Sequence, residues 1–438
     1  MFPRNGDYSE YSLIQTEEIV KYSKCDKYDK VRRKVLDMLD KYDIPNLQLV
    51  NKKPNRVCSY IDLKILLHGQ CPKVELWKQD SCGEFEFEDL KGADDNLEKI
   101  ERRKLIMFLR RLFAIKIYSK PQLMRRNVVY SLNGITKTQL HRVVNEIRIL
   151  QDLSKHDPNK HYIVRLHQVL ESSKNNLNSG KFYLIYDFYP LGPTMGPYSR
   201  YNHWHDIGGK PETVILVRSA DDLENNGNEC GDNELNSPFK IGNKLVYVPN
   251  PRLREIGEDG IKHFVYCVAT ALCKLHELGI AHRDVKPDNL LLAENGDIVL
   301  IDFNSAEYLI EGKYVSGTEG TYAFFPPEYC KLSFYSDDDN NDGNANKLLG
   351  RPADMWALGV TVWCWLFNEL PFQGNNILDL FSNIAKCELT IPNNPSFSSE
   401  GKDVILSLLN PDPESRWTAK QLLESKWLNS GVNCRQCR

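Results

Sequence analysis

The residues best suited to chemistry lie close together, in the stretch 282–304. Asp284 carries a carboxylate that could accept a proton, and Lys286 places a positive charge beside it. Asn289 and Asp302 add a side-chain amide and a second carboxylate to the same stretch. Chemistry at one bond needs groups that meet on opposite sides of it, so the chain has to bring these side chains together.

A β-hairpin would bring them together. The apolar runs 290–292 and 298–301 have the length of short strands, and the polar stretch 294–297 between them contains the glycine of a turn. Pairing of the two runs returns Asp302 to the side of Asn289. The alternative is a chance turn at 282–284 before an ordinary hairpin. So many residues suited to catalysis within one short stretch argue against chance.

The same stretch resembles the catalytic segment of the eukaryotic protein kinases. The resemblance is carried by His-Arg-Asp at 282–284 and by Asp-Phe-Asn at 302–304. It implies an α+β bilobal kinase fold, with a small β-rich N-lobe that holds one key helix and a larger helical C-lobe. It also implies ATP and Mg²⁺ as cofactors and transfer of the γ-phosphoryl group to protein hydroxyls.

The resemblance gives each polar residue of the stretch a role. Asp284 accepts the proton of the substrate hydroxyl, and Lys286 neutralises charge on the transferred phosphoryl group. Asn289 and Asp302 hold the metal. Lysine at position 286 is typical of serine/threonine kinases, as is Thr321, which the family uses to bridge the catalytic aspartate and lysine. These residues predict a serine/threonine kinase.

The first half of the chain supplies a second set of expected residues. Lys116, in Ala-Ile-Lys at 114–116, resembles the lysine on the third kinase strand, which contacts the α- and β-phosphates. Glu146, on an amphipathic helix expected over 138–152, would pair with that lysine. After the bulky gatekeeper Tyr186, backbone groups of a hinge would bind the adenine. The nucleotide-binding residues expected in this way are Leu67, Gly69, Val74, Ala114, Lys116, Asp187, Tyr189, Leu291 and Asp302.

Two places depart from the kinase pattern. The glycine-rich loop aligned on Val74 retains only Gly69, because Leu67 and Pro72 replace the other two glycines. Proline removes a backbone donor, so a weaker phosphate cradle is expected. Asn304 replaces the glycine after Asp-Phe, a mild change because asparagine tolerates a left-handed backbone. The degenerate loop leaves open an alternative function, a catalytically weak or inactive kinase-fold scaffold that binds partners through its insertions.

Regulation by phosphorylation of the activation loop is not expected. The position at which many kinases carry a phosphorylated threonine is Gly317, although Arg283, the arginine that would pair with such a phosphate, is present. We expect Glu319 or another carboxylate to face Arg283, and activity to be independent of loop phosphorylation. Ser316 or Thr318, with a shift of one residue, is the alternative phosphorylation site.

Two further contacts are expected to be structural. Glu328 should form a buried ion pair with Arg416. Asp354 should anchor the backbone of the catalytic loop from a buried helix. Neither contact is expected to involve the substrate.

The sequence of the C-lobe resembles one subfamily of kinases in particular. Residues 354–364 and the Leu-Gly-Pro at 191–193 are similar to the calcium/calmodulin-dependent protein kinase kinases, which phosphorylate the activation loops of other kinases. The expected partner is therefore a protein substrate, in the narrower reading another kinase. The calmodulin-binding helix of that family has no counterpart after Trp427, so calmodulin binding is not supported.

The expected domain organisation is a kinase domain with additions. Three segments interrupt the lobes, and the last two, which are rich in Asn, Asp and Gly, predict long surface loops. The boundaries are an N-terminal extension at 1–56, a kinase domain at 57–430 divided into an N-lobe at 57–188 and a C-lobe at 189–430, insertions near 78–110, 196–250 and 331–350, and a tail at 431–438.

Composition excludes several other classes of protein. A net charge of -3 gives no field that would favour nucleic acid, and no apolar run is long enough to span a membrane. Scattered cysteines without a framework predict an intracellular, cytoplasmic protein with reduced thiols. The pair Cys434 and Cys437 lacks a second pair, and the acidic run 337–344 lacks the glutamate of a calcium loop, so a metal site at either place is disfavoured.

Overall fold

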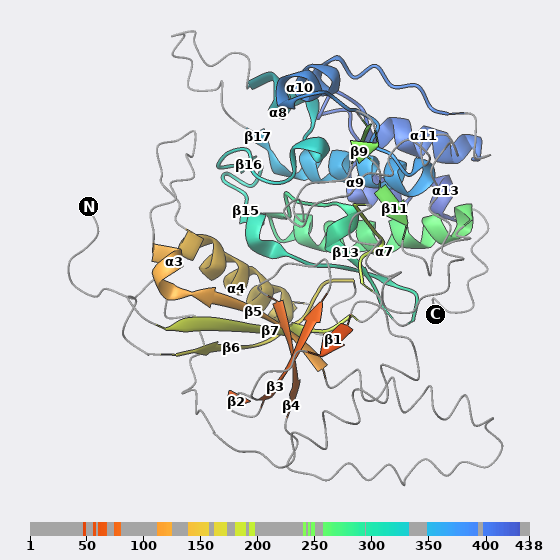
Figure 1. Ribbon diagram of the computed structural model, residues 1–438. Coiled ribbons are helices and arrows are strands. Elements are labelled where there is room, and N and C mark those ends of the chain that lie inside the picture. The colour runs from red at the N-terminus through yellow and green to blue at the C-terminus, as the bar shows by residue number, and fades with distance from the viewer. Residues whose placement is uncertain are drawn as a thin grey trace, which may run out of the picture.

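The computed structural model describes two lobes of the chain (Figure 1). The described residues are 112–124, 139–156, 162–172, 180–189, 192–197, 257–293, 295–332, 348–392 and 397–429, with isolated strands at 47–49, 56–57, 60–67, 74–79, 240–241, 244–245 and 247–249. Most of the expected N-terminal extension, the interiors of the three insertions and the tail lie outside these residues. The architecture is the expected α+β bilobal one.

The smaller lobe is built on an antiparallel sheet with the strand order β1-β3-β4-β5-β7-β6, and β2 pairs with β3. Its strands are β1 (Leu47–Leu49), β2 (Arg56–Val57), β3 (Tyr60–Leu67), β4 (Val74–Gln79), β5 (Leu112–Ser119), β6 (Leu166–Glu171) and β7 (Lys181–Asp187). This sheet is the β-rich part that the kinase resemblance implied for the N-lobe.

Alternation along β5 decides which side chains can serve a site. Phe113 and Ile115 point to one face, where they pack with Ile185 in a small core of their own. Because successive residues of a strand point to opposite faces, Lys116 projects from the other face, which is turned toward the second lobe. The buried apolar residues of β5 thus fix the direction in which its one lysine, Lys116, points.

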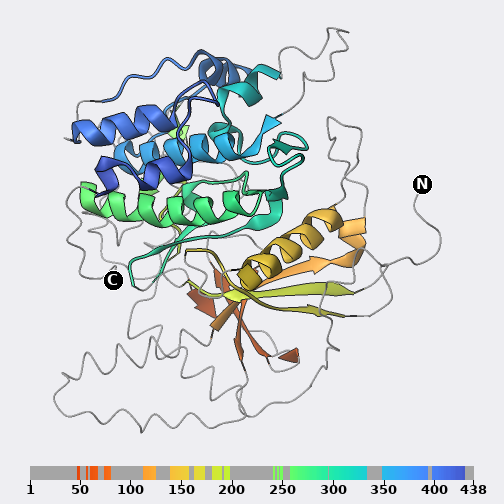
Figure 2. The ribbon, with the colours of Figure 1, turned by 180° about the vertical axis from the view of Figure 1, so that it is seen from behind.

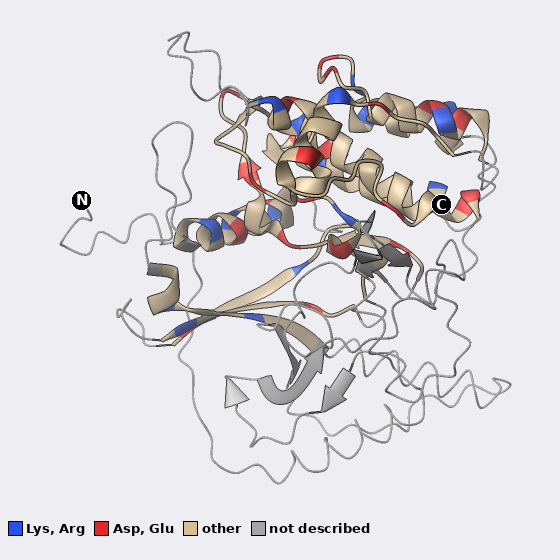
Figure 3. Ribbon diagram, turned by 45° about the horizontal axis from the view of Figure 1, so that its top comes forward, with Lys and Arg blue, Asp and Glu red and all other residues tan. Residues whose placement is uncertain are grey.

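Two helices follow β5, α3 (Lys120–Met124) and α4 (Gln139–His156). Helix α4 buries one apolar stripe, as its 3.6-residue period predicts, and the stripe consists of Leu140, Val143, Val144, Ile147, Leu150 and Leu153. Figures 1 and 2 both show α4 between the sheet and the helical lobe. Figure 3 shows that acidic and basic residues also occur along this helix.

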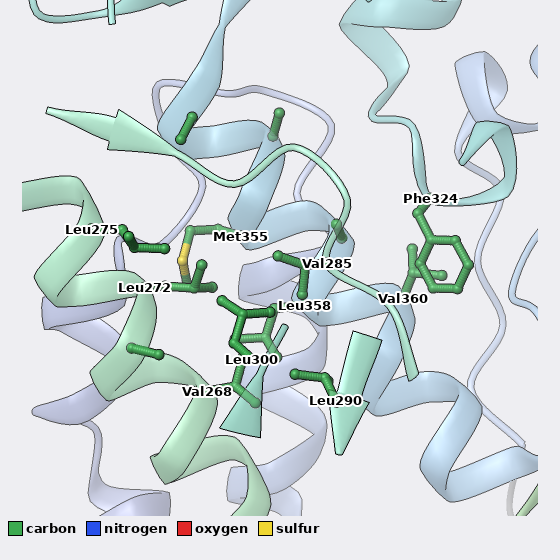
Figure 4. Close-up of a cluster of buried hydrophobic side chains, with 14 of the residues drawn as sticks. Val268, Leu272, Leu275, Val285, Leu290, Leu300, Phe324, Met355, Leu358 and Val360 are labelled. Carbon is green, nitrogen blue, oxygen red and sulfur yellow. The ribbon is translucent and has the colours of Figure 1, made fainter. Parts of the chain in front are cut away.

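The larger lobe packs helices around a central buried pair, α7 (Glu258–Glu277) and α9 (Gly350–Phe367). Figure 4 shows side chains from both helices, including Leu272 and Leu358, meeting Leu290 and Leu300 of a short hairpin. The remaining helices are α8 (Pro327–Leu332), α10 (Ile377–Lys386), α11 (Ser399–Leu408), α12 (Ala419–Leu423) and α13 (Lys426–Asn429). The hairpin, which carries the expected site, is therefore anchored in the main core.

The hairpin consists of β13 (Leu290–Leu292) and β14 (Ile298–Leu300), paired with Leu290 opposite Leu300. Two other short pairs flank the loops around it, β12 (Ile280–Ala281) with β15 (Glu307–Tyr308) and β16 (Tyr314–Val315) with β17 (Leu348–Leu349). Turns η4 (Pro287–Asn289), η5 (Phe303–Ser305) and η6 (Tyr322–Phe324) connect these elements.

The expected insertion near 196–250 begins and ends at one place. Strand β8 (Met195–Pro197) pairs with β11 (Tyr247–Pro249), and Pro197 lies opposite Tyr247. Between them the structure describes the small pair β9 (Lys240–Ile241) and β10 (Lys244–Leu245). The strand pair closes the base of this long excursion.

A buried ion pair connects distant parts of the larger lobe. The guanidinium of Arg416 donates to both carboxylate oxygens of Glu328, at 2.8 and 3.0 Å, and to the carbonyl of Pro352 at 2.8 Å. This is the structural contact expected from the sequence.

Among the described helices, we find none with the length and apolar character that crossing a membrane requires.

Candidate active site

The hairpin brings the predicted chemical residues together. Leu290 and Leu300 face each other in the ladder, and the amide of Ile301 donates to the carbonyl of Asn289 at 2.9 Å. Asn289 just before one strand and Asp302 just after the other are therefore neighbours, as the spacing predicted.

Asp284 is held by three polar side chains. Its Oδ1 accepts a hydrogen bond from the Thr321 hydroxyl at 2.8 Å, and its Oδ2 accepts one from the Asn289 amide at 2.9 Å. The ammonium group of Lys286 lies 2.8 Å from the same Oδ2 and donates to the Thr321 hydroxyl at 2.6 Å. The carboxylate is thus fixed in orientation beside a positive charge, and Thr321 bridges the aspartate and lysine as expected.

Lys116 joins the two lobes. Its ammonium group lies 2.9 Å from Glu146 on α4 and 2.7 Å from Asp302 beside the hairpin. Glu146 is almost fully buried, and its Oε1 also accepts a hydrogen bond from the Tyr186 hydroxyl at 2.8 Å. One cation from the sheet is therefore shared by a carboxylate of each lobe.

These contacts determine the protonation states at the site. Burial alone would lower the pKa of Lys116, but the carboxylates of Asp302 and Glu146 raise it well above its ordinary value. Burial would raise the pKa of Asp302, and the positive charge of Lys116 outweighs this and lowers it. Burial and the charge of Glu146 raise the pKa of Tyr186, which stays a neutral donor. Near neutral pH the site therefore holds the Lys116 cation beside the ionised carboxylate of Asp302.

Asn289 and Asp302 fit the requirements of a magnesium ion. The amide nitrogen of Asn289 is used by Asp284, which turns the amide oxygen of Asn289 to the other side. The Oδ1 of Asp302 accepts a hydrogen bond from the Lys116 ammonium group. The Oδ2 of the same ionised carboxylate is the oxygen that would face a metal ion. Mg²⁺ binds oxygen ligands and keeps several waters, so an amide oxygen and one carboxylate suit it.

The loop that carries Asp284 is anchored from below by a buried carboxylate. Oδ2 of Asp354 accepts from the amide of His282 at 2.8 Å, and its Oδ1 accepts from the amide of Arg283 at 2.7 Å. The ring of His276 contacts the same carboxylate at 2.9 Å. Asp354 has no exposed surface, so it acts as the backbone anchor that the sequence predicted.

A glycine allows the activation segment to approach this loop. Gly320 has φ +115°, and a Cβ added there would lie 2.2 Å from the carbonyl oxygen of Arg283. A side chain at this position would push the segment away, and with it the adjacent Thr321 that holds Asp284. The glycine is therefore part of how the site is assembled.

Left-handed backbone occurs at a different residue from the one considered in the sequence. Asp302 has φ 63° and Arg283 has φ 69°, whereas Asn304 lies inside the turn η5 and has no positive φ. Asn304 uses its side chain instead, because its Oδ1 accepts a hydrogen bond from the Tyr118 hydroxyl at 3.0 Å. Tyr118 also contacts Glu146 at 3.4 Å. Asparagine at this position therefore ties the Asp-Phe-Asn turn to the strand that carries Lys116.

The carboxylate that faces Arg283 is Glu307, and Glu319 has another partner. The guanidinium of Arg283 lies 2.6 Å from Glu307 and also donates to the carbonyl of Gly317. Glu307 accepts further hydrogen bonds from the amide and hydroxyl of Ser316, at 3.1 and 2.9 Å. Glu319 lies 3.2 Å from Arg142 on α4. Of the two possibilities left open in the sequence, another carboxylate than Glu319 is the correct one.

The residues expected to contact adenine that the structure describes lie on β5, on β7 and the hinge after it, and on the hairpin. Ala114 faces Tyr186 across β5 and β7, and Asp187 ends β7. The carbonyl of Tyr189 accepts from the amide of Gly192 at 3.2 Å, which closes the hinge turn. Leu291 is buried on the hairpin. Leu67 and Val74 are described only as strand residues of β3 and β4, and Gly69 lies outside the described residues, so the phosphate loop stays a prediction.

Three contributors to the site were missed in the sequence. Glu307 and Tyr118 have no motif of their own, and their contacts depend on the pairing of distant strands. His282 was noted only as part of a motif, but its Nε2 lies 3.0 Å from the carbonyl of Ile301 and its Nδ1 lies 3.3 Å from the amide of Asp284. A neutral ring that donates from Nε2 and accepts at Nδ1 satisfies both contacts.

The part of the chain that contains the hairpin is similar to known protein kinases. A family model described as the protein kinase domain matches residues 242–428. The chain is 36% identical over 154 residues to serine/threonine-protein kinase ppk34 of Schizosaccharomyces pombe, which covers 35% of this chain and 40% of that protein. It is 30% identical over 219 residues to a calcium/calmodulin-dependent protein kinase kinase of Caenorhabditis elegans, covering 50% of this chain and 37% of the relative. Serine/threonine-protein kinase GRIK2 of Arabidopsis thaliana is 30% identical over 223 residues, with 50% and 49% covered. The matched part thus spans less than half the length of each of these relatives.

Proposed function

This chain belongs to the eukaryotic protein kinases, and we propose that it transfers the γ-phosphoryl group of ATP to serine and threonine hydroxyls of proteins. The observation that carries the proposal is Lys116, whose ammonium group contacts both Glu146 and Asp302. A nucleotide phosphate needs a fixed cation from one lobe and a metal-binding carboxylate from the other, and here the two touch. The proposed boundaries of the catalytic domain are those expected from the sequence, 57–430.

The nucleotide is proposed to bind between the lobes. Lys116, held by two carboxylates, would contact the α- and β-phosphates, and the hinge at Asp187 and Tyr189 would bind the adenine. Asn289 and Asp302 would hold Mg²⁺, which supplies charge neutralisation on the phosphates. The degenerate loop around Gly69 would contribute fewer backbone donors than a loop with three glycines.

Asp284 is proposed to orient the substrate hydroxyl and accept its proton. The Thr321 hydroxyl and the Asn289 amide hold the carboxylate in one orientation, so little ordering is left for the moment of reaction. Lys286, beside the same carboxylate, would stabilise negative charge on the phosphoryl group as it moves. The pair divides the two tasks of the transfer between an acceptor and a cation.

The protein substrate is proposed to be another kinase. Support comes from the similarity to a relative that is named a protein kinase kinase. Two buried thiols outside any disulfide, Cys330 and Cys364, support a cytoplasmic location for this activity. A comparison of rates on activation-loop peptides of kinases and on a generic basic protein tests the substrate class.

The roles of the two aspartates can be separated by substitution. Asp284→Asn should lower kcat by at least about 100-fold and leave nucleotide affinity nearly unchanged, because only proton acceptance and orientation are lost. Asp302→Ala should remove the dependence of nucleotide affinity on Mg²⁺. Radiolabelled phosphate transfer and fluorescent-nucleotide titration with and without Mg²⁺ measure the two effects.

Asp403→Asn is a matched control, since Asp403 is exposed on α11 away from the site. If the wild type is active and the Asp284→Asn variant is equally active, the assignment of Asp284 as the base is rejected. If the wild type neither binds ATP nor transfers phosphate, the scaffold alternative replaces the proposed function.

A further inference from the structure

A second cluster of donor atoms lies at the opposite end of the hairpin from the proposed active site. It consists of His263 and Cys267 on helix α7 and of Asp297, the residue just before β14. One nitrogen, one sulfur and one carboxylate oxygen lie within 4.8 Å of one another. Among the described residues, this is the group of histidine, cysteine and acidic side chains that comes close enough to share one ion.

The spacing on the helix explains why the first two donors converge. Residues four apart lie on the same face of a helix, one turn above the other. Here the Sγ of Cys267 lies 3.7 Å from the Nε2 of His263, and the Oδ1 of Asp297 lies 2.9 Å from that same nitrogen. The imidazole nitrogen is thus the point at which both other donors meet.

These separations suit a tetrahedral ion. At metal–ligand lengths of about 2.3 Å for sulfur and 2.0 Å for nitrogen, a separation of 3.7 Å corresponds to an angle of roughly 115–120° at the metal. The separation of 2.9 Å corresponds to roughly 90°, so the carboxylate has to turn outward slightly on metal binding. Asp297 has room to do so, because its side chain is 26% exposed.

A second hydrogen bond already orients the carboxylate. The amide of Asn295 donates to the Oδ2 of Asp297, which leaves Oδ1 directed at His263. Outer contacts of this kind fix the ligand oxygen that faces a metal. Cys267 has no exposed surface, whereas the side chain of His263 is 32% exposed, so the cluster is closed on the protein side and open toward solvent. Water can fill a fourth position.

We propose that His263, Cys267 and Asp297 form a zinc site. A thiolate, an imidazole and a carboxylate form a donor set that suits zinc, whereas magnesium and calcium prefer oxygen ligands alone. The ion clamps helix α7 to the turn of the hairpin. Because the other end of this hairpin carries Asn289 and Asp302, zinc occupancy stabilises the support of the catalytic residues without contacting them.

Cobalt(II) titration of the full chain tests the site, because Co²⁺ reports thiolate coordination and tetrahedral geometry by its absorption. The experiment uses a background in which Cys434 and Cys437 are replaced by serine, which removes the one Cys-x-x-Cys pair in the chain's last residues. We expect one equivalent of Co²⁺ with a thiolate charge-transfer band, displaced by Zn²⁺, and a rise in Tm with Zn²⁺.

Three variants decide the ligands. Cys267→Ser should remove the thiolate band, and Asp297→Asn should weaken Co²⁺ binding by about 10-fold or more. Cys273→Ser is the matched control, since Cys273 lies on the same helix but its thiol contacts Glu277. If Cys267→Ser does not fold by circular dichroism, Asp297→Asn, on the exposed side, decides alone.

Absence of a thiolate band in the background protein would overturn the zinc site. So would a band that persists in Cys267→Ser, or a Co²⁺ affinity that is unchanged in Asp297→Asn, since the ion would then be bound elsewhere. Both results are independent of kinase activity, so this test and that of the proposed function fail separately.

Discussion

Replacing Glu307 by glutamine should show what holds the activation segment in place. The side chains of Arg283 and Glu307 are 2% and 10% exposed, and their charged atoms lie 2.6 Å apart. Glutamine keeps the size of the side chain and one oxygen for the amide of Ser316, but it removes the negative charge. The guanidinium of Arg283 is then left buried without an opposite charge.

The magnitude follows from the burial of this pair. Breaking a buried ion pair by removing one partner costs about 3–5 kcal/mol, and the remaining hydrogen bonds of glutamine place this case at about 3 kcal/mol. About 1 kcal/mol shifts Tm by about 2–4 °C in a domain of roughly 150–250 residues and by less in a larger one such as that proposed at 57–430, so a fall of up to about 6 °C is expected. Loosening of Ser316 and Gly317 reaches Thr321, and misplacement of Asp284 should lower kcat by about 10–100-fold.

Differential scanning fluorimetry and steady-state phosphate transfer measure the two effects. Glu319→Gln is the control, because Glu319 forms a more exposed pair with Arg142, 3.2 Å apart, for which about 1 kcal/mol or less is expected. A fall in Tm for Glu307→Gln no larger than that for Glu319→Gln would refute the reasoning. It would mean that Arg283 does not depend on the charge of Glu307.

Two further predictions concern phosphorylation and pH. Phosphatase treatment should leave most of the activity intact, because Glu307 already neutralises Arg283. Loss of most of the activity after phosphatase treatment, with the same loss in Thr318→Ala, would contradict this. Burial lowers the pKa of His282 below its ordinary value of about 6.5. A histidine held neutral contributes stability above that value and loses it as the pH falls, by at most about 1.4 kcal/mol per pH unit. Urea midpoints between pH 7.5 and 5.5 should therefore fall in the wild type and less in His282→Gln, and equal slopes would count against a neutral ring.

Much of the site could be predicted because its geometry is local. The hairpin follows from two apolar runs and a glycine-containing turn, and this alone places Asn289 beside Asp302. Alternation along β5 places Lys116 on the face opposite Ile115. The bridge by Thr321 came from the family resemblance, and the structure contains it.

The partner of Arg283 could not be predicted, because it depends on the register of two-residue strands. Pairing of β12 with β15 sets Ala281 opposite Glu307, which brings the carboxylate next to the arginine that follows. The sequence left the partner open between Glu319 and another carboxylate. Register in strands this short leaves no periodic signal in the sequence. The left-handed backbone at Asp302 was missed for a related reason, since tertiary contacts and not residue type impose it.

The strand pair at the base of the excursion between Pro197 and Tyr247 has a consequence for how this protein can vary. The two ends are already neighbours across an antiparallel pair, about 5 Å apart at Cα. The entropy of closing a chain between fixed ends grows only with the logarithm of its length, so doubling the excursion costs about 0.6 kcal/mol. Chain closure by itself therefore adds little cost when this excursion is shortened, extended or exchanged for a foreign segment. The excursion is a natural place for evolution, or an engineer, to add a new binding module.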